Sequence, residues 1–245
     1  MTILEARGIT KRYGGLAALT DVDLKVSPSE FVAVIGPNGA GKSTLLNVLT
    51  GLVVPDTGSV MLANEEITGL ATNKRIRAGL GRTFQHGRTF PRLSVLENIM
   101  VGAAIDVRLG ECELRNKAME TIDYMGLADI ADRTIKTLSY GRRRMVELAR
   151  VVACDPKVLL LDEPAAGLNS AEVEQLMQRL SSLREKHRLA IVLIEHNMGM
   201  VMRLAERIFV LNFGCRIAEG TPTEIQSDPA VLSAYLGEGS VHARM

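Results

Sequence analysis

Aromatic side chains are scarce in this sequence, which has no tryptophan and only 4% aromatic residues among its 245 positions. Proteins that bind single-stranded nucleic acid stack the bases on aromatic rings within a positively charged groove. The formal net charge here is only +1, so the sequence also lacks a strong positive field. We therefore expect no nucleic acid among its partners.

Long hydrophobic runs are missing as well. Apolar runs such as residues 189–194 (LAIVLI) are far shorter than the roughly 20 residues that span a bilayer. Residues 1–13 mix charged and polar side chains and lack the apolar core of a secretory signal. The three cysteines, Cys112, Cys154 and Cys215, form no Cys-x-x-Cys pair, and we expect reduced thiols. These absences predict a cytoplasmic protein.

Three short segments consist entirely of apolar residues, which is typical of strands buried on both faces of a sheet. They are Phe31–Ile35, 158–161 (VLLL) and 189–194. Stretches with helical spacing separate them, and this alternation predicts a mainly parallel sheet covered by helices. The composition, 47% hydrophobic and 23% charged, agrees with a globular chain of this α/β class.

The two ends of the chain show other patterns. Residues 4–9 and 18–26 are rich in strand formers and predict an N-terminal antiparallel β region. Residues 208–219 have the pattern of a β-hairpin. After Pro222 we expect a terminal helix, with Thr223 as its N-terminal cap.

Residues 91–153 show no buried-strand pattern. Their apolar side chains recur at helical spacing, as in Met145, Leu148, Ala149 and Val152. We interpret this stretch as a helical subdomain inserted between strands of the sheet. The chain is then a single domain over residues 1–245, with a catalytic core from 1–90 and 154–245 and an inserted subdomain at about 91–153.

A glycine-rich segment follows the first buried strand and fits the phosphate-binding pattern G-x-x-x-x-G-K-[ST]. Glycines let backbone N–H groups close around phosphate oxygens, and the helix that begins near Lys42 directs its positive dipole end at them. Lys42 adds a charge for the β- and γ-phosphates, and the Ser43 hydroxyl can bind Mg²⁺. The predicted phosphate-binding residues are Gly36, Asn38, Gly39, Ala40, Gly41, Lys42, Ser43 and Thr44.

Two acidic residues, Asp162 and Glu163, follow the apolar strand 158–161. A carboxylate at the C-terminal end of such a strand, here Asp162, can hold Mg²⁺ or its bound water. Adjacent residues of an extended chain point to opposite sides, so Glu163 is free to orient and deprotonate an attacking water. The two motifs predict nucleotide chemistry and leave kinases, GTPases and motor ATPases open.

Further segments occur in a fixed order around these two motifs. Gln85 precedes the helical stretch, and residues 138–141 (LSYG) lie just before a helix, with Ser139 available as its cap. Residues 165–169 (AAGLN) follow the acidic pair, and His196 follows the strand 189–194. In this order the motifs resemble those of ABC-type ATPases, and the resemblance covers about residues 3–236.

The resemblance implies roles that the residues alone do not. Ser139 and Gly141 would contact the γ-phosphate held by the opposite subunit of a dimer. Gln85 would lie in the loop between core and helical subdomain, as a catalytic residue and Mg²⁺ ligand. His196 would be the switch histidine of the catalytic site, and Tyr13 the aromatic residue on the adenine ring.

The same resemblance implies the setting of the protein. ATP and Mg²⁺ are the expected cofactors, bound between two ATPase chains, either two copies or sister chains. Integral membrane permease subunits are the expected partners, with a periplasmic or extracellular solute-binding protein acting indirectly. The chain would lie on the inner face of the plasma membrane.

Three segments look most like ATP-binding subunits of bacterial branched-chain amino acid importers, or of related urea and amide importers: 81–86 (GRTFQH), 165–169 and 228–237 (DPAVLSAYLG). Two features depart from that pattern. Arg142 stands where the family usually has glutamine, and residues 105–118 are short for this subgroup. The alternatives are an exporter ATPase, for instance for lipopolysaccharide, an ABC ATPase outside transport, and a P-loop kinase.

Overall fold

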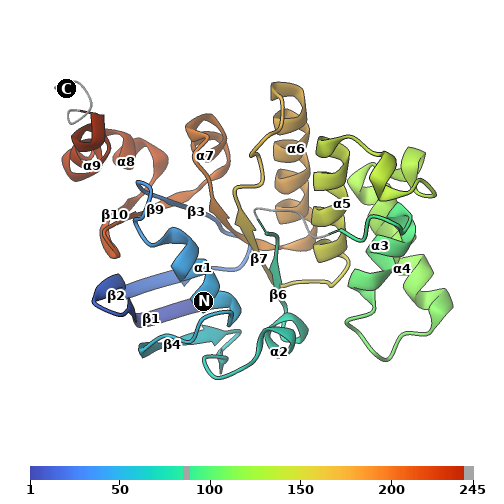
Figure 1. The fold of residues 1–245 in the computed structure, drawn as a ribbon, viewed down its shortest axis with the longest axis horizontal. Helices are drawn as coiled ribbons and strands as arrows, with labels where there is room; N and C mark the ends of the chain where they lie inside the picture. Colours follow the sequence, from blue (N-terminus) through green and yellow to red (C-terminus); the bar gives the residue numbers. More distant parts are fainter. Residues whose placement is uncertain (85–88, 240–245) are drawn as a thin grey trace.

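The computed structural model describes residues 1–84 and 89–239, and within these ranges the strands form two sheets (Figure 1). The larger sheet has the order β10-β9-β3-β8-β7-β6. Its strands are β3 (Phe31–Ile35), β6 (Leu80–Arg82), β7 (Val158–Asp162), β8 (Ala190–Ile194), β9 (Arg207–Asn212) and β10 (Cys215–Gly220). All neighbours are parallel except the edge hairpin β9–β10, which confirms the predicted mainly parallel sheet.

The central strands β3, β7 and β8 are buried at every position, because both faces of the sheet are covered. Side chains alternate between the two faces: Val158 and Leu160 pack on the side of α1 (Lys42–Thr50), whereas Leu159 and Leu161 pack on the side of α6 (Ser170–His187). This covering explains why the strand sequences are continuously apolar.

The smaller sheet is antiparallel and has the order β2-β1-β4-β5. It consists of β1 (Leu4–Tyr13), β2 (Leu16–Val26), β4 (Thr57–Leu62) and β5 (Glu65–Glu66). The N-terminal antiparallel region is therefore confirmed, and it also includes two strands from beyond the phosphate loop that the sequence pattern did not indicate. Helix α1 lies between the two sheets, and its buried leucines share one apolar cluster with both (Figure 1).

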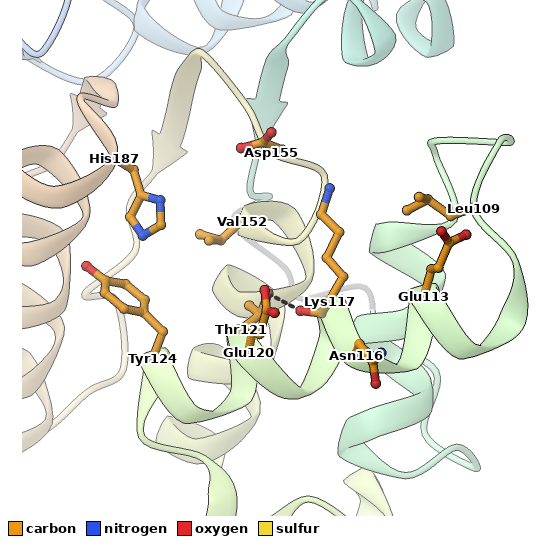
Figure 2. A pocket seen from close by; sticks show the side chains of 10 residues that line it. All are labelled: Leu109, Glu113, Asn116, Lys117, Glu120, Thr121, Tyr124, Val152, Asp155 and His187. Atoms are coloured by element: carbon orange, nitrogen blue, oxygen red, sulfur yellow. Dashed lines mark hydrogen bonds between the residues drawn. The ribbon is translucent and has the colours of Figure 1, made fainter.

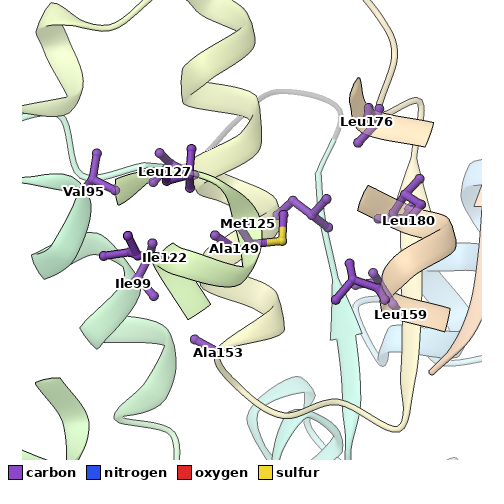
Figure 3. Close-up of a cluster of buried hydrophobic side chains, with 14 of the residues drawn as sticks. Val95, Ile99, Ile122, Met125, Leu127, Ala149, Ala153, Leu159, Leu176 and Leu180 are labelled. Carbon is purple, nitrogen blue, oxygen red and sulfur yellow. The ribbon is translucent and has the colours of Figure 1, made fainter. Parts of the chain in front are cut away.

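The α-helices in the described part of the chain between β6 and β7 form one end of the molecule: α3 (Val95–Ala103), α4 (Glu111–Met125) and α5 (Tyr140–Val152). Two short 3-10 helices, η1 (Ala128–Ile130) and η2 (Ile135–Thr137), lie between α4 and α5. Figure 3 shows buried side chains of the α-helices, such as Ile99, Ile122 and Ala149, in one cluster with Leu159 of β7 and Leu180 of α6. The helical part thus packs on the face of the sheet opposite α1.

The C-terminal part contains α7 (Met198–Leu204), α8 (Pro222–Ser227) and α9 (Pro229–Gly239), while α2 (Thr72–Arg77) precedes β6. The expected terminal helix is two helices, because Pro229 begins a new one. The predicted cap was wrong: Thr221 caps α8, and its backbone N–H donates to Glu224 in a capping box, while Thr223 lies inside the helix. Within the described ranges, no helix is both long and apolar enough to cross a membrane.

Candidate functional site

The phosphate loop, residues 36–44, joins the end of β3 to the start of α1. Two of its glycines are required by their surroundings. Gly36 has φ 148°, and a Cβ there would lie 2.0 Å from the carbonyl oxygen of Leu211; Gly41 has φ 104°, and its Cβ would lie 2.5 Å from Ala18 O. The loop therefore lies directly on strands β2 and β9, where no larger residue fits.

Lys42 is buried within this loop. Its Nζ donates to the carbonyl oxygens of Gly36 at 2.6 Å and Pro37 at 2.9 Å. Phosphate oxygens would compete with these neutral acceptors, since hydrogen bonds between charged groups are shorter and stronger. The ammonium is thus held where an incoming phosphate would meet it.

A cavity of about 400 Å³ opens at this loop. Its lining includes ten of the predicted site residues: Tyr13, Asn38, Gly39, Ala40, Gly41, Lys42, Ser43, Thr44, Glu163 and His196. Leu16, Ala17, Ala18 and Phe213 complete the lining. Residues of the N-terminal sheet, of the phosphate loop and of the segments that follow β7 and β8 therefore line one cavity.

A larger cavity, of about 630 Å³, lies elsewhere, along α4 and beside His187 at the end of α6 (Figure 2). Three carboxylates line this cavity, those of Glu113, Glu120 and Asp155, against one ammonium, that of Lys117, so its charge would repel a triphosphate. The smaller cavity at the phosphate loop, which Lys42 lines, is the better candidate for a ligand that carries phosphates.

Asp162 ends β7 and is buried, and its Oδ2 accepts a hydrogen bond from Arg82 Nη2 at 3.1 Å. Arg82 also donates to Asn47 and Thr50 of α1, so it links the acidic strand end to the helix that follows the phosphate loop. The Ser43 hydroxyl and the Asp162 carboxylate are oxygen ligands of the type Mg²⁺ prefers when it binds together with phosphates. No group of three or more His, Cys, Asp or Glu side chains in the described ranges could hold a metal by itself.

Glu163 follows Asp162 in a left-handed backbone conformation, with φ 45°. Its Oε1 lies 3.3 Å from Nε2 of His196. The two side chains meet because β7 and β8 are parallel neighbours with Asp162 opposite Ile194, so both chain segments leave the sheet at the same edge. Glu163 and His196 were predicted from separate segments of the sequence, and the pairing of β7 with β8 brings their side chains into contact.

Glu195 is a site residue that the sequence motifs missed. It is buried, and its Oε1 accepts the N–H of Ala165 at 2.8 Å. Its Oε2 accepts the N–H groups of His196 at 3.0 Å and Asn197 at 3.1 Å. One carboxylate therefore holds the loop after β7 to the loop after β8. The sequence signal that could have identified Glu195 is its position directly after a fully apolar strand.

Ser139 caps α5, as expected: its hydroxyl oxygen accepts the N–H of Arg142. Residues 139–141 lie against residues 167–172 of the same chain. A Cβ on Gly141 would lie 2.1 Å from Glu172 Oε1, and a Cβ on Gly167 would lie 3.0 Å from the Tyr140 ring. Ser139 and Gly141 are not among the residues that line the cavity at the phosphate loop of their own chain.

Gln85, predicted as a catalytic residue and Mg²⁺ ligand, lies outside the described residues. The residue before it is held in place: the carbonyl oxygen of Phe84 accepts a hydrogen bond from Arg144 at 2.6 Å. Arg144 and Arg82 are, with Glu195, the site residues that the motifs did not reveal.

Comparison with known proteins gives two matches to family models. Residues 19–166 match the family described as "ABC transporter". Residues 215–241 match the family described as "Branched-chain amino acid ATP-binding cassette transporter". These matches confirm the family resemblance of the motifs.

Curated relatives match over nearly their full length. The high-affinity branched-chain amino acid transport ATP-binding protein LivG of Escherichia coli (strain K12) is 39% identical over 250 residues, covering 96% of this chain and 98% of the relative. BraF of Pseudomonas aeruginosa, which has the same description, is 41% identical with the same coverage. The lipopolysaccharide export system ATP-binding protein LptB of Escherichia coli (strain K12) is 36% identical over 238 residues, covering 97% and 98%.

Solved structures of ATP-binding cassettes are similar to this chain in fold as well as in sequence. The ADP conformation of MJ1267, an ATP-binding cassette of an ABC transporter, has a TM-score of 0.89 at 31% identity, covering 97% of this chain and 99% of that one. The dimeric post-hydrolysis state of the cassette MJ0796, bound to ADP and phosphate, has a TM-score of 0.80 at 29% identity, covering 90% and 99%.

Proposed function

This chain belongs to the ABC transporter family of ATP-binding subunits, which bind and hydrolyse ATP with Mg²⁺, and we propose that it powers the import of branched-chain amino acids or related small solutes. Two kinds of similarity support this substrate class. LivG and BraF, at 39% and 41% identity, are described as branched-chain amino acid transport proteins. The match of residues 215–241 to the branched-chain amino acid family points to the same substrate class. The exporter alternative has less support, since LptB is 36% identical.

The observation that carries the proposal of hydrolysis is the meeting of Lys42, Glu163 and His196 at one cavity. Lys42 and the loop N–H groups would bind the phosphates, and Tyr13 at the rim would pack on the adenine ring. Ser43 and Asp162 would hold Mg²⁺, with Gln85 as a further ligand; the ion, when bound, neutralises charge on the phosphate oxygens.

Glu163 is the proposed general base. Its carboxylate would take a proton from the water that attacks the γ-phosphate, and His196, 3.3 Å away, would orient that carboxylate and contact the γ-phosphate. A base on a held backbone turn loses little orientational freedom before the reaction, which favours the chemical step.

A second ATPase chain, either another copy or a sister chain, would complete each site. Ser139 and Gly141 lie outside the cavity of their own chain, which supports a role toward nucleotide bound by the partner. MJ0796, similar in fold, is described as dimeric with ADP and phosphate bound. In this arrangement residues 91–153 act as a helical subdomain, and the segment around Gln85 passes its motion to permease subunits in the plasma membrane. The ATPase chain then lies on the cytoplasmic face, and a solute-binding protein on the other side acts indirectly.

The substrate is tested by reconstitution in vesicles. The chain is assembled with the permease subunits that co-purify with it and with their solute-binding protein, and uptake of labelled leucine, urea and acetamide is measured with ATP inside. We expect leucine uptake that needs ATP. ATP hydrolysis stimulated by these permeases without uptake of any of the three solutes would contradict the importer assignment.

The Glu163→Gln variant is the matched control in the same vesicles. The amide keeps the size of the side chain but cannot accept a proton, and a general base contributes about 10²–10⁴-fold to rate. We expect normal ATP binding, hydrolysis slowed by that factor, and no uptake. Wild-type turnover in this variant would mean that another group activates the water.

A further inference from the structure

The run of three arginines at the start of α5 divides into two exposed side chains and one buried one. Arg142 lies at the surface beside Asp129, with 45% and 60% of their side chains exposed. Arg143 is exposed as well. Arg144 is only 5% exposed, because each step along a helix turns the side chain by about 100° and the third one faces the interior.

Every nitrogen of the buried Arg144 guanidinium donates a hydrogen bond. Nε donates to Pro164 O at 3.3 Å. Nη2 donates to Asp162 O at 3.2 Å and to Glu163 O at 3.0 Å. Nη1 donates to Phe84 O at 2.6 Å and to Glu147 Oε2 at 3.0 Å. One side chain thus holds three consecutive carbonyl groups of the turn that contains the proposed base, together with the residue before Gln85.

This turn needs support from outside itself. Glu163 has φ 45°, a conformation that residues other than glycine adopt at a cost and keep only where the surroundings enforce it. The two carbonyl groups that Arg144 Nη2 binds belong to Asp162 and Glu163 itself. A relaxation of Glu163 to negative φ would turn these carbonyls and break the hydrogen bonds. The planar guanidinium therefore fixes the conformation that directs Glu163 toward His196.

The carboxylate of Glu147 balances the charge of Arg144 inside the protein. Both side chains are nearly buried, at 5% and 10% exposure. Burial raises the pKa of Glu147, and the nearby Arg144 opposes that shift. A variant that removes only the arginine would leave Glu147 buried without its partner, which is more destabilising than loss of the whole pair.

We propose that Arg144 is a positioning residue for ATP hydrolysis, which connects the first turns of α5 to the backbone of the turn carrying Glu163. This inference rests on the proposed roles of Glu163 and Ser139. Because Ser139 caps the same helix, a shift of α5 when its N-terminus meets nucleotide on the partner chain would reach Glu163 through Arg144. The position of the base then depends on whether the dimer has formed.

The test compares neighbouring arginines of one helix. Arg144→Lys and Arg144→Met are measured beside Arg143→Met, which removes a neighbouring arginine from an exposed position. We expect kcat to fall by about 10²-fold in both Arg144 variants, the loss typical of a misplaced catalytic group, and to remain normal in Arg143→Met. Binding of a non-hydrolysable ATP analogue, measured by calorimetry, should be unchanged in all three variants, since the partners of Arg144 lie outside the phosphate loop. Equal turnover in the Arg143 and Arg144 variants would overturn the proposal.

Two further variants separate positioning from folding. In Arg144→Met with Glu147→Gln, no buried carboxylate is left unpaired, so stability should recover while kcat stays low; recovery of kcat would assign the defect to Glu147 instead. In a Glu163→Gln background, Arg144→Met should lower the residual turnover no further, because the two residues act through one step. A loss of the same factor in both backgrounds would mean a merely structural role. Wild-type hydrolysis and its loss in Glu163→Gln test the proposed function separately, so either idea can fail alone.

Discussion

Replacing Glu195 by glutamine should lower both the Tm and the kcat, although Glu195 does not line the cavity at the phosphate loop. The carboxylate accepts three backbone N–H groups, from Ala165, His196 and Asn197. Glutamine has one acceptor oxygen, which we expect to serve the pair at His196 and Asn197. Its NH₂ group would then face the N–H of Ala165, and two donors cannot bond to each other.

The magnitude follows from the bonds that are lost. A buried hydrogen bond to a charged acceptor contributes about 1.5–3 kcal/mol to stability. For a chain of this size 1 kcal/mol shifts Tm by about 2–4 °C, so we expect Tm to fall by about 3–12 °C. The loops that carry Glu163 and His196 would also separate, and kcat should fall by about 10–10²-fold at unchanged ATP affinity.

Differential scanning fluorimetry measures Tm, and a phosphate-release assay measures kcat at a temperature where the variant stays folded. Glu185→Gln, an exposed substitution on α6, is the matched control and should match wild type in both assays. If Glu195→Gln also matches wild type in Tm and kcat, the carboxylate does not hold the two loops together.

Three further predictions concern the nucleotide, the partner chain and pH. Lys42→Ala should lose most ATP affinity in calorimetry, because the phosphates lose a charge-assisted bond worth about 1.5–3 kcal/mol, and wild-type affinity would remove the nucleotide from this loop. Ser139→Asp keeps a good helix cap but places a carboxylate near the partner's γ-phosphate, so this variant should bind ATP yet neither dimerise nor hydrolyse it. Mixing it with Lys42→Ala chains should restore part of the ATPase activity, because each mixed dimer has one intact site. A mixture that traps no ATP would contradict the arrangement in trans. Hydrogen bonds from Arg108 lower the pKa of Asp106 from 3.8 to about 2, so this ion pair stabilises the fold fully above pH 3.8 and loses that effect as the pH falls toward 2. Asp106→Asn should flatten this part of the curve of stability against pH, measured by acid unfolding. An unchanged curve would refute a contribution of Asp106 to stability.

Residues that are neighbours in the chain allowed most of the correct predictions. The buried strands and the cap at Ser139 each depend on a few consecutive side chains, so their patterns are visible without a fold. The misassigned cap of α8 shows the limit of that reasoning. Thr221 and Thr223 are both acceptable caps by type, and the capping box with Glu224 decides between them.

The sequence by itself determined four candidate site residues, Lys42, Ser43, Asp162 and Glu163, because each lies in a motif of a few consecutive residues whose chemistry can be named without a fold. His196 entered only through the order of the motifs along the chain.

Only the tertiary structure decided how these groups are held. Arg82 bonds to Asp162 across 80 residues of sequence, Arg144 to Phe84 across 60, and Glu195 to Ala165 across 30. No local pattern indicates such pairs, since each depends on which strand ends become neighbours in the sheet. Glu163 and His196 are a further pair that no local pattern indicates. They come into contact because they follow the C-terminal ends of β7 and β8, which are parallel neighbours in the sheet. Parallel strands are joined through long connections, so their neighbours are set by packing of the whole chain.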